Sequence, residues 1–302
     1  MKSGFAPILI MIVFIVLLTA CQDFKRDNDI TGQGEPVTES GQLPDDKGDA
    51  GILNEGPMQQ PADPKVLHDE FGSSPFKREQ IGFSRVRTAV EQKYPLIKEL
   101  FSSKGIQYPP KAVYLRAFKR EGILELWIKS GSQESYVLFK SYDICRSSGE
   151  PGPKRQEGDR QVPEGFYHIN HFNPASSFFL SLGINYPNAS DRILGIQGDL
   201  GGEIYIHGGC ATVGCIPLTD DGIMELYLVA AEAKSQGQDK IPVHIFPTVM
   251  DGESFEALMD EYSENSRLTD FWANLKEGFD AFEESRQAPG FRVDDRGRYI
   301  FE

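Results

Sequence analysis

The segment EIYIHGGCATVGCIPLTDDG, residues 203–222, brings one histidine, two cysteines and four glycines together. Apolar residues typical of β-strands lead directly into His207, and Cys210 and Cys215 follow within eight residues. Three interpretations fit such a group: a thiol nucleophile with its base, a metal site, or two covered sulfur atoms in a tight turn.

The surroundings of Cys215 favour nucleophilic chemistry. Thr219 is a predicted N-cap, so a helix begins just after Cys215, and a helix N-terminus together with an imidazole favours the reactive thiolate. His207 leaves the end of a strand as the candidate base. The glycines permit a tight turn, and the backbone amides of Gly208, Gly214 and Cys215 are candidate donors to an oxyanion. A histidine and a cysteine eight residues apart also occur in metal sites, so spacing alone leaves that alternative open.

Patterns on both sides of this segment predict an α+β fold. Residues 219–236 show helical spacing that ends at Gly237, and residues 252–285 contain two further helical stretches. Period-two patterns separated by turn residues predict an antiparallel meander followed by more strands. These predicted strands cover residues 112–118, 123–128, 135–145, 166–172, 203–207 and 241–247, with a terminal hairpin over 291–301. We therefore expect a mostly β domain with mixed or antiparallel sheets and packed helices.

The N-terminus has the features of an export signal. One lysine precedes an apolar run from Ile8 to Leu18, which is short for a membrane span and suited to the hydrophobic region of a signal peptide. An uncleaved anchor helix is the alternative. Leu18-Thr19-Ala20-Cys21 resembles the lipobox of bacterial lipoproteins, which implies cleavage after residue 20 and acylation of Cys21.

Composition divides the rest of the chain. Residues 21–76 are rich in Gly, Pro, Asp and Gln, so we expect a disordered acidic tether. Residues 77–111 form a predicted N-terminal helical segment, interrupted or kinked at Pro95. Residues 112–250 contain most of the predicted strands and the segment with His207 and Cys215, and residues 251–302 form a helical extension that ends in the hairpin.

Net charge and cysteine content limit the possible binding partners and the possible roles of the cysteines. The net charge of −14 over 302 residues leaves no basic surplus for nucleic-acid phosphates. An exported chain can form disulfides, and with Cys215 needed as a thiol, Cys145 and Cys210 remain to pair. Alternatively, Cys210 is a small covered thiol, or it joins His207 and Cys215 on a metal ion.

Residues 112–250 resemble the L,D-transpeptidase catalytic domain, also called the YkuD domain. The signature of this family is a strand into His-Gly followed by Ser/Thr-x-Gly-Cys, matched here at His207-Gly208 and at residues 212–215. The strand motif Thr/Val-Pro-x-Gly-x-Phe/Tyr is matched by VPEGFY, residues 162–167.

Two departures from the family pattern are present. Only six residues separate Gly208 from Cys215, and Pro217 stands where most members carry an arginine. Both departures are shared with the YafK-like branch. That branch is also similar at YDIC, GPK, GDRQVPEGFY, YPN and SDR and at the C-terminal segment, so the resemblance covers about residues 80–300.

The resemblance implies a periplasmic cysteine enzyme that acts on peptidoglycan stem peptides without cofactor or metal. Cys215 would attack the carbonyl on the L-centre of the diamino acid, and His207 would donate and accept protons. Hydrolysis that releases wall-linked lipoprotein is associated with the YafK-like branch. The alternatives are a crosslinking L,D-transpeptidase and a non-catalytic, lipid-anchored wall-binding module. We expect a monomer held by lipid to the periplasmic face of the envelope, at the outer membrane.

Other polar residues are candidates for substrate binding. Arg192 can hold a carboxylate in a bidentate manner, although a surface salt bridge explains it equally well. Thr212 belongs to the family motif. His168 and His171 are three apart, so on a regular strand they face opposite sides and at most one points into the site. His244, within IPVHIFP, is expected at the edge of the core.

Overall fold

The structure, a computed structural model, describes residues 62–302. The predicted signal peptide, the lipidation of Cys21 and the tether up to residue 61 lie outside the described residues. Among residues 62–302, no helix combines the length and the apolar character needed to cross a membrane.

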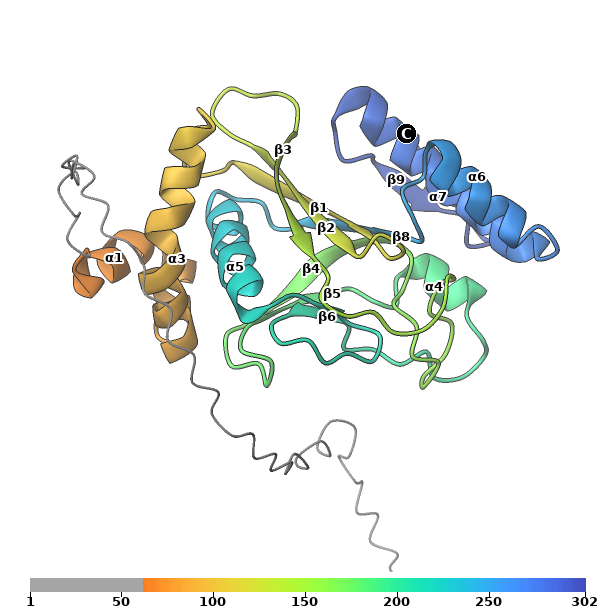
Figure 1. The fold of residues 1–302 in the computed structure, drawn as a ribbon, viewed down its shortest axis with the longest axis horizontal. Coiled ribbons are helices and arrows are strands. Elements are labelled where there is room, and N and C mark those ends of the chain that lie inside the picture. Colours follow the sequence, from red (N-terminus) through yellow and green to blue (C-terminus); the bar gives the residue numbers. More distant parts are fainter. Residues whose placement is uncertain (1–61) are drawn as a thin grey trace, which may run out of the picture. The chain divides into compact units, whose positions relative to one another are not determined.

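One eight-stranded sheet forms the centre of the body, with the strand order β3-β2-β1-β8-β4-β5-β6-β7 (Figure 1). Most neighbouring strands are antiparallel, whereas β1 pairs with β8 and β6 pairs with β7 in parallel. The strands are β1 (Ala112–Phe118), β2 (Ile123–Lys129), β3 (Val137–Asp143), β4 (Gly165–Asn173), β5 (Ser181–Ile184), β6 (Tyr205–His207), β7 (Ile216–Pro217) and β8 (Pro242–Phe246). The predicted α+β class and the antiparallel β1-β2-β3 meander are confirmed.

Three helices precede the sheet: α1 (Pro64–Phe71), α2 (Pro75–Gln80) and α3 (Ser84–Ser103). The predicted tether is therefore wrong over residues 64–76. Asp63 caps α1 through its side chain, and Phe71 is fully buried with its ring 5.6 Å from that of Tyr94. These helices are short, and only a few apolar residues hold them to the body. Because the segment is polar overall, its composition did not predict them. Helix α3 runs through Pro95 without interruption.

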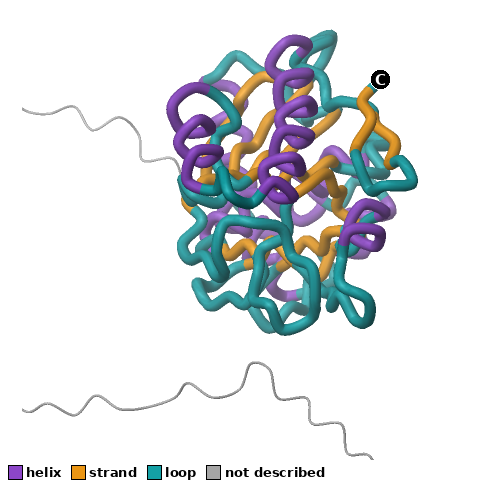
Figure 2. Tube along the Cα trace, turned by 90° about the vertical axis from the view of Figure 1, so that its right-hand side faces the viewer, coloured by secondary structure: helices purple, strands orange, loops and turns teal. Residues whose placement is uncertain are grey.

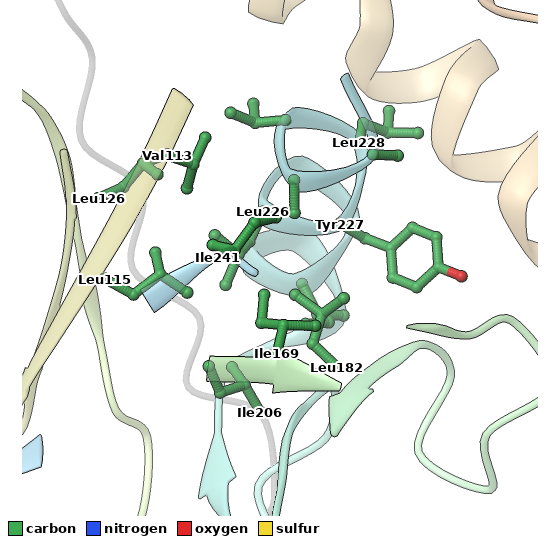
Figure 3. Close-up of a cluster of buried hydrophobic side chains, with 14 of the residues drawn as sticks. Val113, Leu115, Leu126, Ile169, Leu182, Ile206, Leu226, Tyr227, Leu228 and Ile241 are labelled. Carbon is green, nitrogen blue, oxygen red and sulfur yellow. The ribbon is translucent and has the colours of Figure 1, made fainter. Parts of the chain in front are cut away.

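Helix α5 (Asp220–Ser235) lies between the sheet and α3 (Figure 1). Its residues from Leu226 to Ala231 are almost completely buried. Figure 3 shows Leu226 and Tyr227 of α5 among side chains from several strands, including Val113, Ile169 and Ile206. A helix that is apolar on nearly all sides requires partners on nearly all sides, which explains its central position.

A buried ion pair joins the N-terminal helices to α5. Lys77 Nζ lies 2.8 Å from Glu232 Oε2, and both side chains are almost completely buried. The Tyr108 hydroxyl donates to Glu232 Oε1 at 2.7 Å, so each oxygen of the buried carboxylate has a donor. Removing one partner of such a pair would leave a buried charge without its counter-ion and would destabilise the fold. The N-terminal helices are therefore an integral part of the folded body.

A second core lies where the C-terminal extension packs on the strands. The extension consists of α6 (Gly252–Glu261), α7 (Ser266–Ser285) and the hairpin β9 (Phe291–Val293) with β10 (Tyr299–Phe301). Trp272 and Phe279 of α7 pack in one cluster with Phe118, Phe166 and Phe246. The short helix α4 (Ala189–Leu194) lies between β5 and β6 in the chain.

Glu164, just before β4, connects this extension to the central sheet. Its side chain is completely buried and accepts from Lys119 Nζ and Trp272 Nε1, each at 2.8 Å. We expect Glu164→Gln to lower the free energy of unfolding by about 3–5 kcal/mol, because Lys119 is left as a buried charge without its counter-ion. Urea denaturation tests this, with Asp280→Asn in the exposed Lys276–Asp280 pair as the control. Equal effects of the two substitutions would contradict the assignment.

Candidate active site

His207 is the last residue of β6, and Cys215 directly precedes β7, the parallel neighbour of β6. Ile206 of β6 pairs with Ile216 of β7, and both isoleucines are buried in the main core. Because side chains alternate along a strand, His207 and Cys215 point to the opposite face as diagonal neighbours. Figure 2 shows loops at the lower end of the body. In Figure 1, β6, the strand that ends at His207, lies toward the same end.

Glycine is required where the chain leaves His207. A Cβ atom at Gly208 would lie 2.5 Å from Asp220 Oδ1 and 2.7 Å from the carbonyl oxygen of Phe178. Asp220, in the first turn of α5, accepts from the backbone N–H of Gly209 at 2.9 Å. Gly214 has a φ of +90°, a backbone conformation that glycine adopts without strain. The loop between His207 and Cys215 is therefore fixed by sterics and by the start of α5.

The imidazole of His207 is set up as a base. Its side chain is buried, and Nδ1 lies 2.6 Å from the carbonyl oxygen of Gly208. Because a carbonyl oxygen only accepts, Nδ1 carries the proton and Nε2 keeps its lone pair. Burial lowers the pKa of His207 below its usual 6.5, against the smaller opposing effect of the Gly208 hydrogen bond. The ring is thus neutral at pH 7 and able to accept a proton at Nε2.

A loop from the segment before β5 holds the imidazole in place. The ring of Phe178 stacks on that of His207, with centroids 4.5 Å apart and planes inclined by 29°. Arg85 of α3 donates to the carbonyl oxygens of Ser176 and Phe179, the latter at 2.9 Å. The sequence analysis missed both Arg85 and Phe178, because no local pattern reports a contact between α3 and a loop some ninety residues away.

Thr212 supports the backbone of Cys215. Its hydroxyl accepts from the Cys215 N–H at 3.0 Å and donates to the Cys215 carbonyl oxygen at 2.8 Å. The hydroxyl thus closes the turn that presents the thiol, and the substrate-binding role of Thr212 stays a prediction. Cys215 is half-buried, with Sγ 3.7 Å from the carbonyl oxygen of Glu203.

The amides predicted to form an oxyanion hole have acceptors within the protein. The N–H of Gly208 donates to the Leu180 carbonyl oxygen at 3.2 Å, and that of Gly214 donates to Ser148 Oγ at 2.7 Å. The Cys215 N–H is engaged by Thr212, as described above. An oxyanion hole assembled from Gly208, Gly214 and Cys215 is therefore not formed in this structure, because each of the three N–H groups already has an acceptor within the protein.

Cys145 and Cys210 form a disulfide bond beside the candidate site. Both residues are exposed, and the backbone N–H of Cys145 donates to the Pro217 carbonyl oxygen at 3.1 Å. Residues 145–148 are thus attached at three points to the segment that carries Cys215. These are the disulfide to Cys210, the hydrogen bond to Pro217 and the hydrogen bond between Ser148 and Gly214. The segment after β3 thus braces the loop between His207 and Cys215.

Loss of this disulfide should destabilise the fold. The bond closes a loop with a sequence separation of 65, for which chain entropy predicts a contribution of about 4 kcal/mol. We expect the Cys145→Ser, Cys210→Ser double variant to lose that amount in denaturant unfolding under non-reducing conditions. Peptide mapping of the wild type without reductant verifies the bond, and a loss below about 1 kcal/mol would contradict its stabilising role.

The other predicted substrate residues lie away from Cys215. His168 lines a separate cavity between β4, β8 and the C-terminal extension. Arg192 is exposed in the last turn of α4. The structure places His168 in that other cavity, and the substrate-binding role of Arg192 stays a prediction. Strand β4 shifts register between Ile169 and His171 and so departs from a regular strand. His171 instead pairs with Gly183, which pairs with Tyr205 of β6, and these three share the face of Cys215.

Among the described residues, no group of three or more His, Cys, Asp or Glu side chains could hold a metal ion. His207 has Phe178 stacked on its ring and Gly208 bonded to Nδ1, and Cys210 is bonded to Cys145. The arrangement that the residues do form is a thiol and a neutral imidazole on one face of the sheet.

Comparison with known proteins agrees with this geometry. The family model of the L,D-transpeptidase catalytic domain, YkuD, matches residues 117–245. YafK of Escherichia coli strain K12, named as a candidate L,D-transpeptidase, is 39% identical over 190 residues, which cover 62% of this chain and 73% of YafK. The chain belongs to the L,D-transpeptidase family. YafK of Escherichia coli O157:H7 matches to the same extent.

Solved structures give looser likenesses. The helical cell shape determining protein Pgp2 of Campylobacter jejuni has a TM-score of 0.36 and 17% identity, covering 66% of this chain and 80% of Pgp2. Bd1075 of Bdellovibrio bacteriovorus has a TM-score of 0.34 and 20% identity, covering 58% of this chain and 61% of Bd1075.

Proposed function

We propose that this protein is a cysteine hydrolase that cleaves an amide at the L-centre of the diamino acid in peptidoglycan stem peptides. One observation carries the proposal: His207 ends β6 and Cys215 directly precedes β7, the strand paired with β6, and the Gly208 carbonyl oxygen at Nδ1 leaves Nε2 of the neutral imidazole as the base. Membership of the L,D-transpeptidase family supports peptidoglycan as the substrate.

The reaction follows from these two side chains. Cys215 Sγ attacks the carbonyl carbon while His207 Nε2 takes the thiol proton, which gives a tetrahedral oxyanion and an imidazolium. Collapse of this intermediate breaks the C–N bond, and Nε2–H protonates the departing amine. The product is a thioester on Cys215. Water then attacks the thioester with Nε2 again as base, and the carboxylic acid leaves as the thiol is restored.

Two features support hydrolysis over crosslinking. Pro217 occupies the position at which most family members carry an arginine, and it forms part of β7 instead of offering a cation to a second substrate. The loop from Gly208 to Gly214 is short and is tied down through Cys210 and Ser148. A small acceptor such as water needs less room beside the thioester than a second stem peptide does.

The test is incubation of the full-length protein with purified muropeptides and with lipoprotein-linked muropeptides, followed by mass spectrometry of the products. The proposal expects shortened stems and released lipoprotein with the mass of one water added across the products. Accumulation of crosslinked dimers would replace the hydrolase by a transpeptidase. Absence of any product, together with slow alkylation of Cys215 by iodoacetamide, would favour the non-catalytic binding module.

We also propose that the protein is exported and anchored by lipid on Cys21 at the periplasmic face of the outer membrane. The lipobox-like residues 18–21 motivate this. In Cys21→Ser we expect an unprocessed precursor that lacks lipid, detected by its larger intact mass and by its loss from the detergent phase. A wild-type protein that begins at Met1 without lipid would contradict the anchor.

A further inference from the structure

A second cavity lies between the sheet and the C-terminal extension. Its volume is about 370 Å³, within the size range of small-molecule sites, and it shares no lining residue with the small cavity at Cys215. The floor is formed by paired residues of β4 and β8, Phe166 with His244 and His168 with Pro242. The segment from Ala288 to Val293 forms the opposite wall.

His244 presents a hydrogen-bond donor to this cavity. The side chain is buried, and its Nδ1 lies 2.8 Å from the hydroxyl of Tyr114, which is fully buried. A phenol hydroxyl is a stronger donor than a neutral imidazole N–H, and an imidazole nitrogen is the stronger acceptor. We therefore assign the Tyr114 hydroxyl as the donor to Nδ1, which puts the proton of the neutral ring on Nε2. Burial lowers the pKa of His244 to about 3, with a smaller contribution from Arg116. His244 is therefore neutral, with an Nε2–H that no described residue accepts.

Two further donors border the cavity. Asn185 Oδ1 accepts from the His168 backbone N–H at 2.7 Å, which leaves the amide nitrogen of Asn185 as a donor. Lys240 is exposed and makes no ion pair with any residue that the structure describes. It lies close enough to His168 to lower the pKa of that imidazole, although burial of the ring is the larger cause.

Two other polar side chains of the cavity wall, Asn188 and Tyr167, are already paired. Asn188 Nδ2 donates to the Phe166 carbonyl oxygen and to the Tyr299 hydroxyl, and its Oδ1 accepts from the Asp191 N–H. The Tyr167 hydroxyl is bonded within the protein to Asp191. What remains on the wall is the His168 imidazole, which has one donor and one acceptor nitrogen, and a set of donors beside apolar side chains. One of these donors, Lys240, is a cation without an ion pair among the described residues, in a chain of net charge −14.

We infer that this cavity binds a small carboxylate that carries an apolar or aromatic group, of amino-acid to dipeptide size. A carboxylate has only acceptors, so it matches the donors of His244, Asn185 and Lys240 without leaving a group unpaired. The rings of Phe166 and Phe291 line the same cavity and suit the apolar part. This site is separate from the proposed hydrolysis and does not depend on it.

The test is a ¹⁹F NMR titration of 4-fluorophenylacetate into the full-length protein carrying Cys215→Ala, which removes the reactive thiol. We expect saturable binding with a Kd in the millimolar range or tighter. The neutral isostere 4-fluorophenylacetamide should bind roughly tenfold more weakly, because it lacks the charge that strengthens each hydrogen bond. Titration of acetyl-alanyl-4-fluorophenylalanine then shows which kind of carboxylate the cavity takes. If this peptide binds, the ligand is a peptide C-terminus. If it does not bind whereas 4-fluorophenylacetate does, the ligand is a free small acid.

Matched variants localise the binding. Lys240→Gln should weaken it by roughly tenfold, and Asn185→Asp should abolish it through repulsion while keeping the Oδ1 acceptor for His168. Lys111→Gln, at another exposed lysine, should change nothing. Unchanged melting temperatures show that all three variants fold. The inference is overturned if the wild-type cavity shows no saturable binding, if acid and amide bind equally, or if Lys240→Gln and Asn185→Asp behave like Lys111→Gln.

Discussion

Replacing Cys215 with alanine is expected to stop turnover of stem-peptide substrates, with a loss in kcat on the order of 10⁴–10⁶. The reason is chemical: the thioester cannot form without Sγ, and no other side chain with a comparable nucleophile is placed beside His207 in the described part of the chain. The measurement is single-turnover release of product from purified lipoprotein-linked muropeptides.

The fold should survive this change. Cys215 is only half-buried, lies outside the disulfide and is held through its backbone by Thr212, so alanine keeps both of those hydrogen bonds. Equal melting temperatures of the variant and the wild type provide the control. Turnover retained in a well-folded Cys215→Ala protein would exclude the thiol mechanism.

Replacing His207 with alanine is expected to lower kcat by about 10²–10⁴, the usual contribution of a positioned general acid–base. The thiol would remain but would lose the group that takes its proton and later protonates the amine. His171→Ala is the matched control, because this exposed histidine lies on the same face of the sheet. A loss in His171→Ala as large as that in His207→Ala would contradict the assignment of the base.

The protonation of His207 gives a second readout. Because burial lowers its pKa, the imidazole in Cys215→Ala should titrate below pH 6.5 when followed by NMR. The same shift sets how stability depends on pH. As the pH drops below 6.5, the histidine of the unfolded chain takes up a proton at a higher pH than the folded one does, so the free energy of unfolding falls. A titration midpoint above 6.5 would mean that the ring is not buried as described.

The strands and the positions of the proposed reactive pair could be predicted because their signals are local. The period-two pattern of residues 112–145 reports directly on β1, β2 and β3, and His207 and Cys215 stand in a short segment whose glycines and helix start are visible in the sequence. Likewise, Thr219 caps α5 as its residue type indicates.

The supporting contacts could not be predicted because they depend on tertiary pairing. Ser148 accepts from Gly214 across a separation of 66 residues, and Phe178 reaches His207 only after β5 pairs with β6. A periodic pattern cannot report a register shift either. The irregularity in β4 brings His171 to the face of Cys215 and places His168 in another cavity.

Trapping of the acyl-enzyme tests the central claim most directly. The full-length protein is mixed with stem-peptide substrate, quenched in acid within the first turnover, digested and mapped by mass spectrometry. The account predicts a stem-peptide acyl group on Cys215 that hydroxylamine removes and that is absent from Cys215→Ala. Product formation at the wild-type rate with no acyl group on Cys215 at any quench time, or with the acyl group on another residue, would contradict it.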